Sequence, residues 1–243
     1  MEPAARGASP DRYESMDGKT LLKRSVNAMT AFGGSISAVS LYFAFEGWEQ
    51  VAWVLMGIGV VIDALDGTAV RLLDLGGALP RYDGARLDEF ADLITYVVAP
   101  VGFVWATGML PFNGLGIATG IIVITVSTLQ FSRTDNKTEN AFWGWPSYWN
   151  IAYFYAWAAD LSAVWVIAGS LILSVGVFLP IPFLYPSKMP KLRKTTFAFG
   201  ILWGGVIFAY LLYPKMSDFW LAASLVFPAY YLALSAAMYD TLK

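Results

Sequence analysis

Apolar segments recur along the whole chain, and each has about the length of a membrane-crossing helix. A window of roughly 20 residues divides the 243 residues into eight such segments. Their ranges are 25–45, 49–73, 86–108, 114–131, 147–159, 162–182, 195–213 and 218–239. The weakest boundary separates the fifth from the sixth, where Asp160 and Ser162 interrupt a long apolar stretch, and without it the count is seven. The pattern predicts an all-α polytopic membrane protein with about eight transmembrane helices.

The composition supports a membrane setting. Hydrophobic residues make up 57% of the chain and charged residues only 14%, whereas a soluble domain carries about 25% charged residues. The net charge of −2 and the scattered basic residues give no reason to expect a nucleic-acid partner. There is no cysteine and no histidine, which excludes disulfides, thiolate or imidazole metal ligands and a serine–histidine–aspartate relay.

The distribution of Lys and Arg predicts the orientation, because basic loops favour the cytoplasmic side. The N-terminal segment and the second, fourth and sixth connections contain the basic residues Arg6, Arg12, Lys19, Lys23, Arg24, Arg71, Arg81, Arg86, Arg133, Lys137, Lys188, Lys191, Arg193 and Lys194. The opposite connections have Lys215 as their only cation. Both termini are therefore expected in the cytoplasm, and the protein is expected in the inner (cytoplasmic) membrane.

The chain divides into two parts. Residues 1–24 are expected to be a cytoplasmic segment, either with an interfacial helix near residues 10–24 or as a solvated tail. Residues 1–18 have no apolar core and do not resemble a signal peptide. Residues 25–243 are expected to form a single transmembrane catalytic domain.

Four carboxylates interrupt the second and third apolar segments. Asp63-x-x-Asp66-Gly67-x-x-x-Arg71 ends the second, and Gly84-x-x-x-Asp88-x-x-x-Asp92 begins the third. Residues three or four apart share a helix face, so two acidic faces can meet. An ionised carboxylate at membrane depth is costly unless it is paired or binds a cation.

Two interpretations of these aspartates are open. Each could form a salt bridge with Arg71, Arg81 or Arg86 at the membrane surface. All four together, with two glycines, indicate a metal site instead. Hard carboxylate oxygens without nitrogen or sulfur ligands select magnesium, manganese or calcium, and such ions neutralise diphosphates. Gly67 and Gly84 allow a close approach to the backbone, and Arg71 offers a planar fork to a phosphate.

These residues resemble the signature of the CDP-alcohol phosphotransferase family, Asp-x-x-Asp-Gly-x-x-Ala-Arg, a short connection, then Gly-x-x-x-Asp-x-x-x-Asp. The chain departs at Val70, where the family has alanine, and in the longer connection from Leu72 to Asp83. That longer connection is similar to one branch, the bacterial phosphatidylcholine synthases. Further similarity lies in Leu79-Pro80-Arg81, Thr95-Tyr96-Val97 and the block Trp145-Pro146-Ser147-Tyr148-Trp149-Asn150. The resemblance extends from about Val26 to Arg193.

The resemblance implies the family's fold, in which Asp63, Asp66, Asp88 and Asp92 hold one or two Mg²⁺ or Mn²⁺ ions against the diphosphate of CDP-diacylglycerol. Gly67, Arg71 and Gly84 would line the CDP site. Asp92 would be the general base that takes the proton from the acceptor alcohol, choline in this branch, and CMP would leave. It also implies a homodimer, with the active site facing the cytoplasm.

Two polar residues lie close to the cytoplasmic end of the first segment. Asn27 and Thr30 would need hydrogen-bond partners at this depth. They could bind the nucleotide, as polar residues on the family's first helix do, or join helices. Arg133 is a candidate for the lipid phosphate, although basic residues at this position more commonly set the orientation and attract anionic headgroups.

The choline site is the least defined part. A quaternary ammonium accepts no hydrogen bond and binds best to aromatic faces near a carboxylate. The candidates are Tyr82, Glu89, Trp145, Tyr148 and Trp149, but Trp and Tyr also gather at membrane interfaces for other reasons. The alternatives are a sibling enzyme that uses serine, glycerol phosphate or inositol phosphate, and an ion- or proton-coupled transporter that uses the intramembrane carboxylates.

Overall fold

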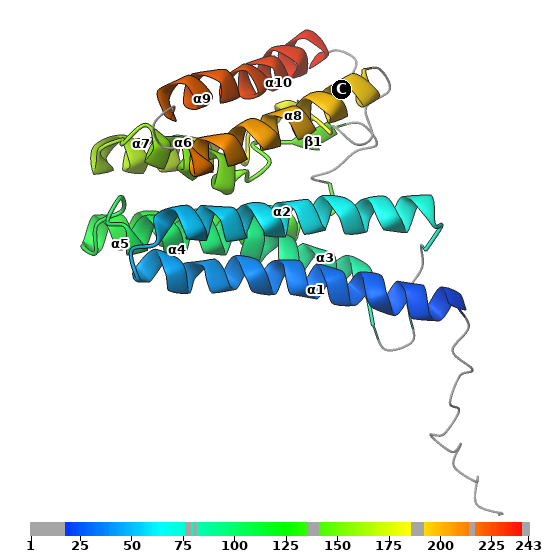
Figure 1. Ribbon diagram of the computed structural model, residues 1–243. Coiled ribbons are helices and arrows are strands. Elements are labelled where there is room, and N and C mark those ends of the chain that lie inside the picture. The colour runs from blue at the N-terminus through cyan, green and yellow to red at the C-terminus, as the bar shows by residue number, and fades with distance from the viewer. Residues whose placement is uncertain are drawn as a thin grey trace, which may run out of the picture.

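Helical rods run side by side in two layers in the computed structural model of the protein (Figure 1). The structure describes residues 18–75, 79, 82–135, 141–185, 192–213 and 217–239. The first layer contains α1 (Gly18–Phe45), α2 (Glu49–Leu72), α3 (Gly84–Asp92), the π-helix η1 (Leu93–Val98), α4 (Ala99–Ala106) and α5 (Gly114–Phe131). The second contains α6 (Trp149–Ala158), α7 (Ala163–Gly176), α8 (Arg193–Leu212), α9 (Ser217–Ser224) and α10 (Val226–Ala237).

Six of the described helical rods are long and apolar enough to cross a membrane, so this is a multi-pass membrane protein. They are Gly18–Phe45, Glu49–Leu72, Gly84–Ala106, Gly114–Phe131, Arg193–Leu212 and Asp218–Ala237. The break expected near Asp160 is present, because α6 ends at Ala158 and Asp160 has a left-handed φ of 49°. The fifth and sixth apolar segments are therefore separate helices, and the total of eight membrane crossings stays a prediction.

The expected end of the sixth segment was wrong, whereas the fifth, expected at 147–159, agrees with α6 within two residues. Helices α6 and α7 have only 10 and 14 residues, about 15 and 21 Å at 1.5 Å per residue, against a hydrocarbon core of about 30 Å. Pro180 and Pro182 follow α7, and proline cannot continue a helix. The sixth segment was expected to reach residue 182, but the chain is extended there.

A two-stranded antiparallel sheet, which the all-α expectation missed, continues these short helices. Strand β1 (Ala141–Trp143) precedes α6, β2 (Pro182–Leu184) follows α7, and Phe142 lies opposite Phe183. Strands of three residues leave no alternation for a sequence pattern to detect. The strand pairing provides hydrogen bonds for backbone N–H and C=O groups that lie outside the short helices. Non-helical chain at membrane depth is tolerated only where its backbone groups are satisfied inside the protein.

Close backbone contacts fix α2 and α3 against α1. A Cβ on Gly59 of α2 would lie 2.0 Å from Ser37 Oγ, and one on Gly34 of α1 would lie 3.2 Å from Ala91 Cα. Only glycine fits such contacts between helices. The Thr95 hydroxyl also donates to Ser37 Oγ at 3.0 Å. The two helices that contain the aspartates are thus held by the same face of α1.

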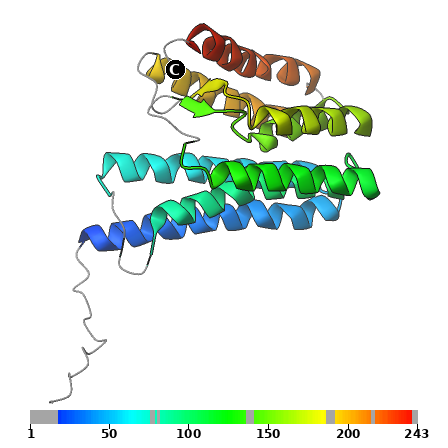
Figure 2. The same ribbon diagram turned by 180° about the vertical axis from the view of Figure 1, so that it is seen from behind.

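The third rod changes its winding directly after Asp92. Residues Leu93–Val98 form a π-helix, in which Ala99 N–H donates to Ile94 O. Pro100 follows, and its missing N–H removes one helical hydrogen bond. A π-turn shifts the later residues around the axis and is common at functional sites. Seen from behind (Figure 2), α5 packs against both η1 and α7 and so joins the two layers.

The N-terminal segment is described only from Gly18, where α1 begins. Residues 10–17 of the expected interfacial helix, together with Arg6, Arg81, Lys137, Lys188, Lys191 and Lys215, lie outside the described residues. The orientation and the two-part division of the chain stay predictions.

Candidate metal centre and flanking cavities

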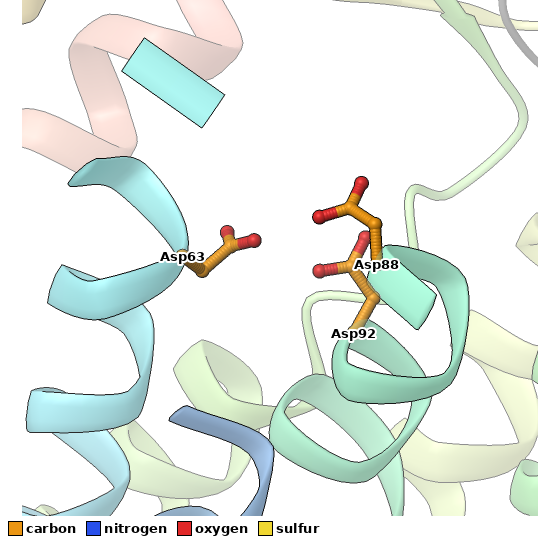
Figure 3. A group of neighbouring side chains, drawn as sticks. All are labelled: Asp63, Asp88 and Asp92. Atoms are coloured by element: carbon orange, nitrogen blue, oxygen red, sulfur yellow. The ribbon is translucent and has the colours of Figure 1, made fainter. Parts of the chain in front are cut away.

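Three of the four predicted aspartates converge between α2 and α3. Each of Asp63, Asp88 and Asp92 offers a carboxylate oxygen, and these oxygens lie within 4.8 Å of one another. Figure 3 shows Asp63 pointing from α2 toward the two aspartates of α3. All three are partly buried. Three carboxylates at this spacing repel one another unless a cation lies between them, and a set of hard oxygen donors suits Mg²⁺ or Mn²⁺.

The fourth, Asp66, does not belong to this cluster. It is 2% exposed and turns toward α1, where Thr30 Oγ1 donates a short hydrogen bond to Asp66 Oδ2. Three of the four predicted metal ligands thus form one cluster, and the expectation that Asp66 also binds one of the one or two ions stays a prediction. Asp66 lies instead in the wall of a cavity beside the cluster.

That cavity, here called the α1-side cavity, lies between α1, α2 and the start of α3 and has a volume of about 480 Å³. All five residues predicted to bind CDP line it, namely Asn27, Thr30, Gly67, Arg71 and Gly84. The two glycines differ in the space around them. A Cβ on Gly84 would lie 3.0 Å from Asn27 Oδ1, and one on Gly67 would lie 3.6 Å from an Arg71 guanidinium nitrogen.

A second cavity of about 380 Å³ lies on the other side of the carboxylates and reaches toward β1 and β2. This sheet-side cavity is lined by Asp63, Ala64, Gly67, Thr68, Arg71, Asp88, Asp92, Tyr96, Gln130, Phe131, Phe142, Pro146, Tyr148, Tyr185 and Phe197. Gly67, Arg71, Asp88 and Tyr185 line both cavities. Volumes of about 300–1,000 Å³ are usual for small-molecule sites, so the cluster has a ligand-sized space on each side.

Only one of the five predicted choline contacts lines the sheet-side cavity, and that is Tyr148. Trp149 is completely buried, and its indole N–H donates to Ser127 Oγ at 2.8 Å. Trp145 packs on Tyr148 and Phe183 at ring distances of 6.2 and 6.0 Å. The two tryptophans thus support the cavity wall from behind instead of forming its surface.

The other two candidates point elsewhere. Tyr82 is 63% exposed in a bridge to Leu79, and Glu89 is an exposed residue of α3. Neither lines either cavity. Tyr82 lies just before α3 and Glu89 directly after Asp88, so closeness in sequence to the aspartates did not place either of them in a cavity wall.

Arg133, predicted to bind the lipid phosphate, lies just after α5. Its guanidinium donates two hydrogen bonds to the Asp135 carboxylate, at 2.8 and 3.0 Å, and this contact holds the pKa of Asp135 below its usual value. The residue lines neither cavity. Its role in binding the lipid stays a prediction.

Tyr96 is a site residue that the sequence analysis did not assign. Its hydroxyl donates to Asp63 Oδ2 at 2.8 Å, and its ring lines the sheet-side cavity. Such a donor orients a metal-binding carboxylate. Tyr96 follows Asp92 by four residues, so helical spacing places it on the face that bears Asp88 and Asp92 and could have identified it.

Replacing Tyr96 with phenylalanine is expected to weaken metal binding, because Asp63 loses the hydrogen bond that orients it. The concentration of Mn²⁺ needed for half-maximal activity should rise about tenfold. Loss of a hydrogen-bond partner of a metal ligand commonly lowers metal affinity by about 10- to 100-fold. Tyr153→Phe is the matched control, since it removes a buried hydroxyl bonded to Ser170 Oγ away from both cavities. An equal shift in the control would assign the effect to general destabilisation.

Comparison with known proteins agrees with this geometry. Residues 25–230 match the CDP-alcohol phosphatidyltransferase family. A phosphatidylcholine synthase of Legionella pneumophila is 35% identical over 222 residues, which are 86% of this chain and 86% of the relative. One from Borreliella burgdorferi is 33% identical, with 79% of this chain and 82% of the relative covered. One from Pseudomonas aeruginosa is 30% identical, with 83% and 87% covered.

The chain therefore belongs to the CDP-alcohol phosphatidyltransferase family. The family resemblance read from the aspartate signature is confirmed. Of the curated relatives reported above, all are bacterial phosphatidylcholine synthases.

Proposed function

We propose that this protein transfers the phosphatidyl group of CDP-diacylglycerol to the hydroxyl of choline, which releases CMP and forms phosphatidylcholine. The names of its relatives support this assignment. The observation that carries it is the position of Asp63, Asp88 and Asp92 between two unlike cavities. One cavity has polar groups suited to a nucleotide, and six of the fifteen residues that line the other are aromatic.

The α1-side cavity binds the donor. Asn27 and Thr30 provide amide and hydroxyl groups on α1, and Lys23 and Arg71 provide positive charge for phosphate oxygens. Gly67 and Gly84 leave room for the diphosphate beside the backbone. Asp88 is common to both cavities, so the diphosphate would lie at their junction.

The three clustered aspartates hold Mg²⁺ or Mn²⁺. A bound ion supplies charge neutralisation for the diphosphate and for the displacement at phosphorus. Asp66 assists from the donor side, where its hydrogen bond with Thr30 fixes its direction. Calcium fits less well, because it takes six to eight oxygen ligands.

Asp92 is the general base. It lines the sheet-side cavity and not the α1-side cavity, which is the position required of a group that meets the acceptor. Its carboxylate takes the proton of the choline hydroxyl. The freed oxygen forms a bond to the phosphorus that bears diacylglycerol, the bond from this phosphorus to the bridging oxygen breaks, and CMP leaves with the electron pair.

All eight apolar segments cross the membrane in this proposal, with both termini in the cytoplasm. α6 has its Trp149, Tyr153 and Phe154 side chains in the protein core, so the extended chain next to it is shielded from lipid. The metal centre lies at the ends of α2 and α3 next to the basic connections and faces the cytoplasm. A homodimer is expected from the family resemblance.

A panel of acceptors tests the proposal. Membranes that contain the protein, supplied with CDP-diacylglycerol and Mn²⁺, should convert labelled choline into lipid and should not convert labelled serine, glycerol phosphate or inositol phosphate. Among the described residues that line the sheet-side cavity, Arg71 is the one cation, and it lies at the boundary with the donor. A phosphorylated acceptor would meet three carboxylates there. Labelling from serine but not choline would contradict the choice of acceptor.

A further inference from the structure

The sheet-side cavity has two chemically different walls. One consists of the clustered aspartates. The opposite wall comes from elements that are distant in sequence: Phe142 from β1, Tyr148 just before α6, and Tyr185 just after β2. Tyr96 of η1 stands where the two walls meet, because its hydroxyl donates to Asp63.

These four rings form a continuous series. Phe142 and Tyr185 have centroids 4.4 Å apart and are inclined by 33°. Phe142 meets Tyr148 edge-on at 6.4 Å, and Tyr148 meets Tyr96 at 6.4 Å. Neighbouring rings therefore support one another. We call Tyr96, Phe142, Tyr148 and Tyr185 the aromatic wall.

The chain that bears the aromatic wall is fixed from behind. Phe142 is paired in the sheet with Phe183. Gly144 has a φ of +83°, and a Cβ there would lie 2.0 Å from Val177 O. The loop thus needs glycine at the point where it turns from β1 toward Tyr148.

A buried polar network holds the rest of this loop against α5. The Gln130 amide donates to Trp145 O at 2.7 Å, and Ser147 Oγ donates to Gln130 Oε1 at 2.5 Å. Ser147 has a left-handed φ of 54° and is completely buried, a strained conformation that the network stabilises. Tyr231 adds a contact from α10, since its hydroxyl donates to Leu184 O at 2.9 Å and its ring lies 6.3 Å from Tyr148. The aromatic wall is therefore held in place by contacts within the protein.

We propose that the aromatic wall is the binding site for the quaternary ammonium of the acceptor, and that Phe142 is a residue that determines specificity. The inference rests on the function proposed above. A trimethylammonium group carries a charge but no N–H, so it cannot form the hydrogen bonds that would select an amine. Ring faces attract such a charge, and the three carboxylates across the cavity add to the attraction. The acceptor hydroxyl, two carbons from the nitrogen, would then point toward Asp92.

Phe142→Leu is the variant that tests the wall, because leucine keeps the apolar bulk and removes the ring face. Phe142 lines only the sheet-side cavity, whereas Tyr185 lines both cavities. Phe183→Leu is the matched control, since Phe183 is the cross-strand partner of Phe142 and lines neither cavity. The KM for choline should rise about tenfold in Phe142→Leu, as expected for the loss of one cation–π contact. The KM for CDP-diacylglycerol should stay unchanged, and Phe183→Leu should change neither.

A neutral isostere of choline separates charge recognition from shape. In 3,3-dimethyl-1-butanol a carbon replaces the nitrogen, so the wild-type protein should prefer choline, and Phe142→Leu should narrow that preference. The inference would be overturned if Phe142→Leu kept the wild-type preference for choline over the isostere. An equal loss of this preference in Phe183→Leu would also overturn it. If the wild-type protein makes no lipid from choline, the proposed function fails instead.

The wild-type protein also offers a test that needs no variant. Tetramethylammonium has the charged head of choline without the hydroxyl, so it should inhibit competitively against choline and not against CDP-diacylglycerol. No inhibition at a hundredfold excess over choline would contradict the aromatic wall even if Phe142→Leu does not fold.

Discussion

Asp92→Asn is expected to abolish turnover while CDP-diacylglycerol still binds. Asparagine has nearly the shape of aspartate but takes up no proton, so the acceptor hydroxyl keeps its hydrogen and does not attack. General-base catalysis contributes about 100- to 10,000-fold, and Asp92 also belongs to the carboxylate cluster. We expect activity to fall at least about 1,000-fold. Labelled choline incorporation measures activity, and retention of labelled CDP-diacylglycerol on the purified protein measures binding.

Asp218→Asn is the matched control for this variant. Asp218 is an exposed carboxylate at the start of α9, outside both cavities, and its replacement should leave activity near the wild-type value. A fully active Asp92→Asn protein would remove Asp92 from the role of base. If the variant loses CDP-diacylglycerol binding as well as activity, Asp92 acts as a metal ligand and not as the general base.

Gly67→Leu is expected to cause the second-largest loss, because Gly67 lines both cavities. A Cβ there makes only an ordinary contact of 3.6 Å with Arg71, and leucine is a good helix former, so the helix should tolerate the change. The rest of the leucine side chain would fill the junction where the diphosphate and the acceptor must meet. We expect activity to fall at least about 100-fold, since misplacing reacting groups by about 1 Å can have this effect.

The control for Gly67→Leu is Gly205→Leu on α8. A Cβ on Gly205 has no atom within 4 Å, so this variant places the same side chain on an open helix face. It should keep nearly full activity and the same thermal stability. If Gly67→Leu lowers the melting temperature as well as activity, the loss reflects misfolding and not a blocked junction.

The aspartate cluster was predictable because its members come from two helices adjacent in sequence. Residues 63, 88 and 92 are placed by regular helical spacing and by one connection, both of which the sequence shows directly. Asp66 was harder to assign, because a difference of three residues rotates it toward α1. Its partner Thr30 is 36 residues away, and the sequence indicated only that both needed partners.

The aromatic wall was not predictable in the same way. Phe142 and Tyr185 come from the two ends of a helical hairpin and meet only because β1 and β2 pair. Trp149 and Tyr148 are neighbours in sequence, yet one is core and the other lines the cavity. An abundance of aromatic residues near a membrane interface does not distinguish these positions. The end of α7 was hidden by apolar chain that continues beyond it.

The most direct measurement of the central claim is the stoichiometry of products from purified protein. With CDP-diacylglycerol, choline and Mn²⁺ in lipid vesicles, the protein should release one CMP for each phosphatidylcholine formed, and neither product should appear when choline or the metal is omitted. CMP released without choline, or in large excess over phosphatidylcholine, would contradict transfer to choline at the junction of the two cavities.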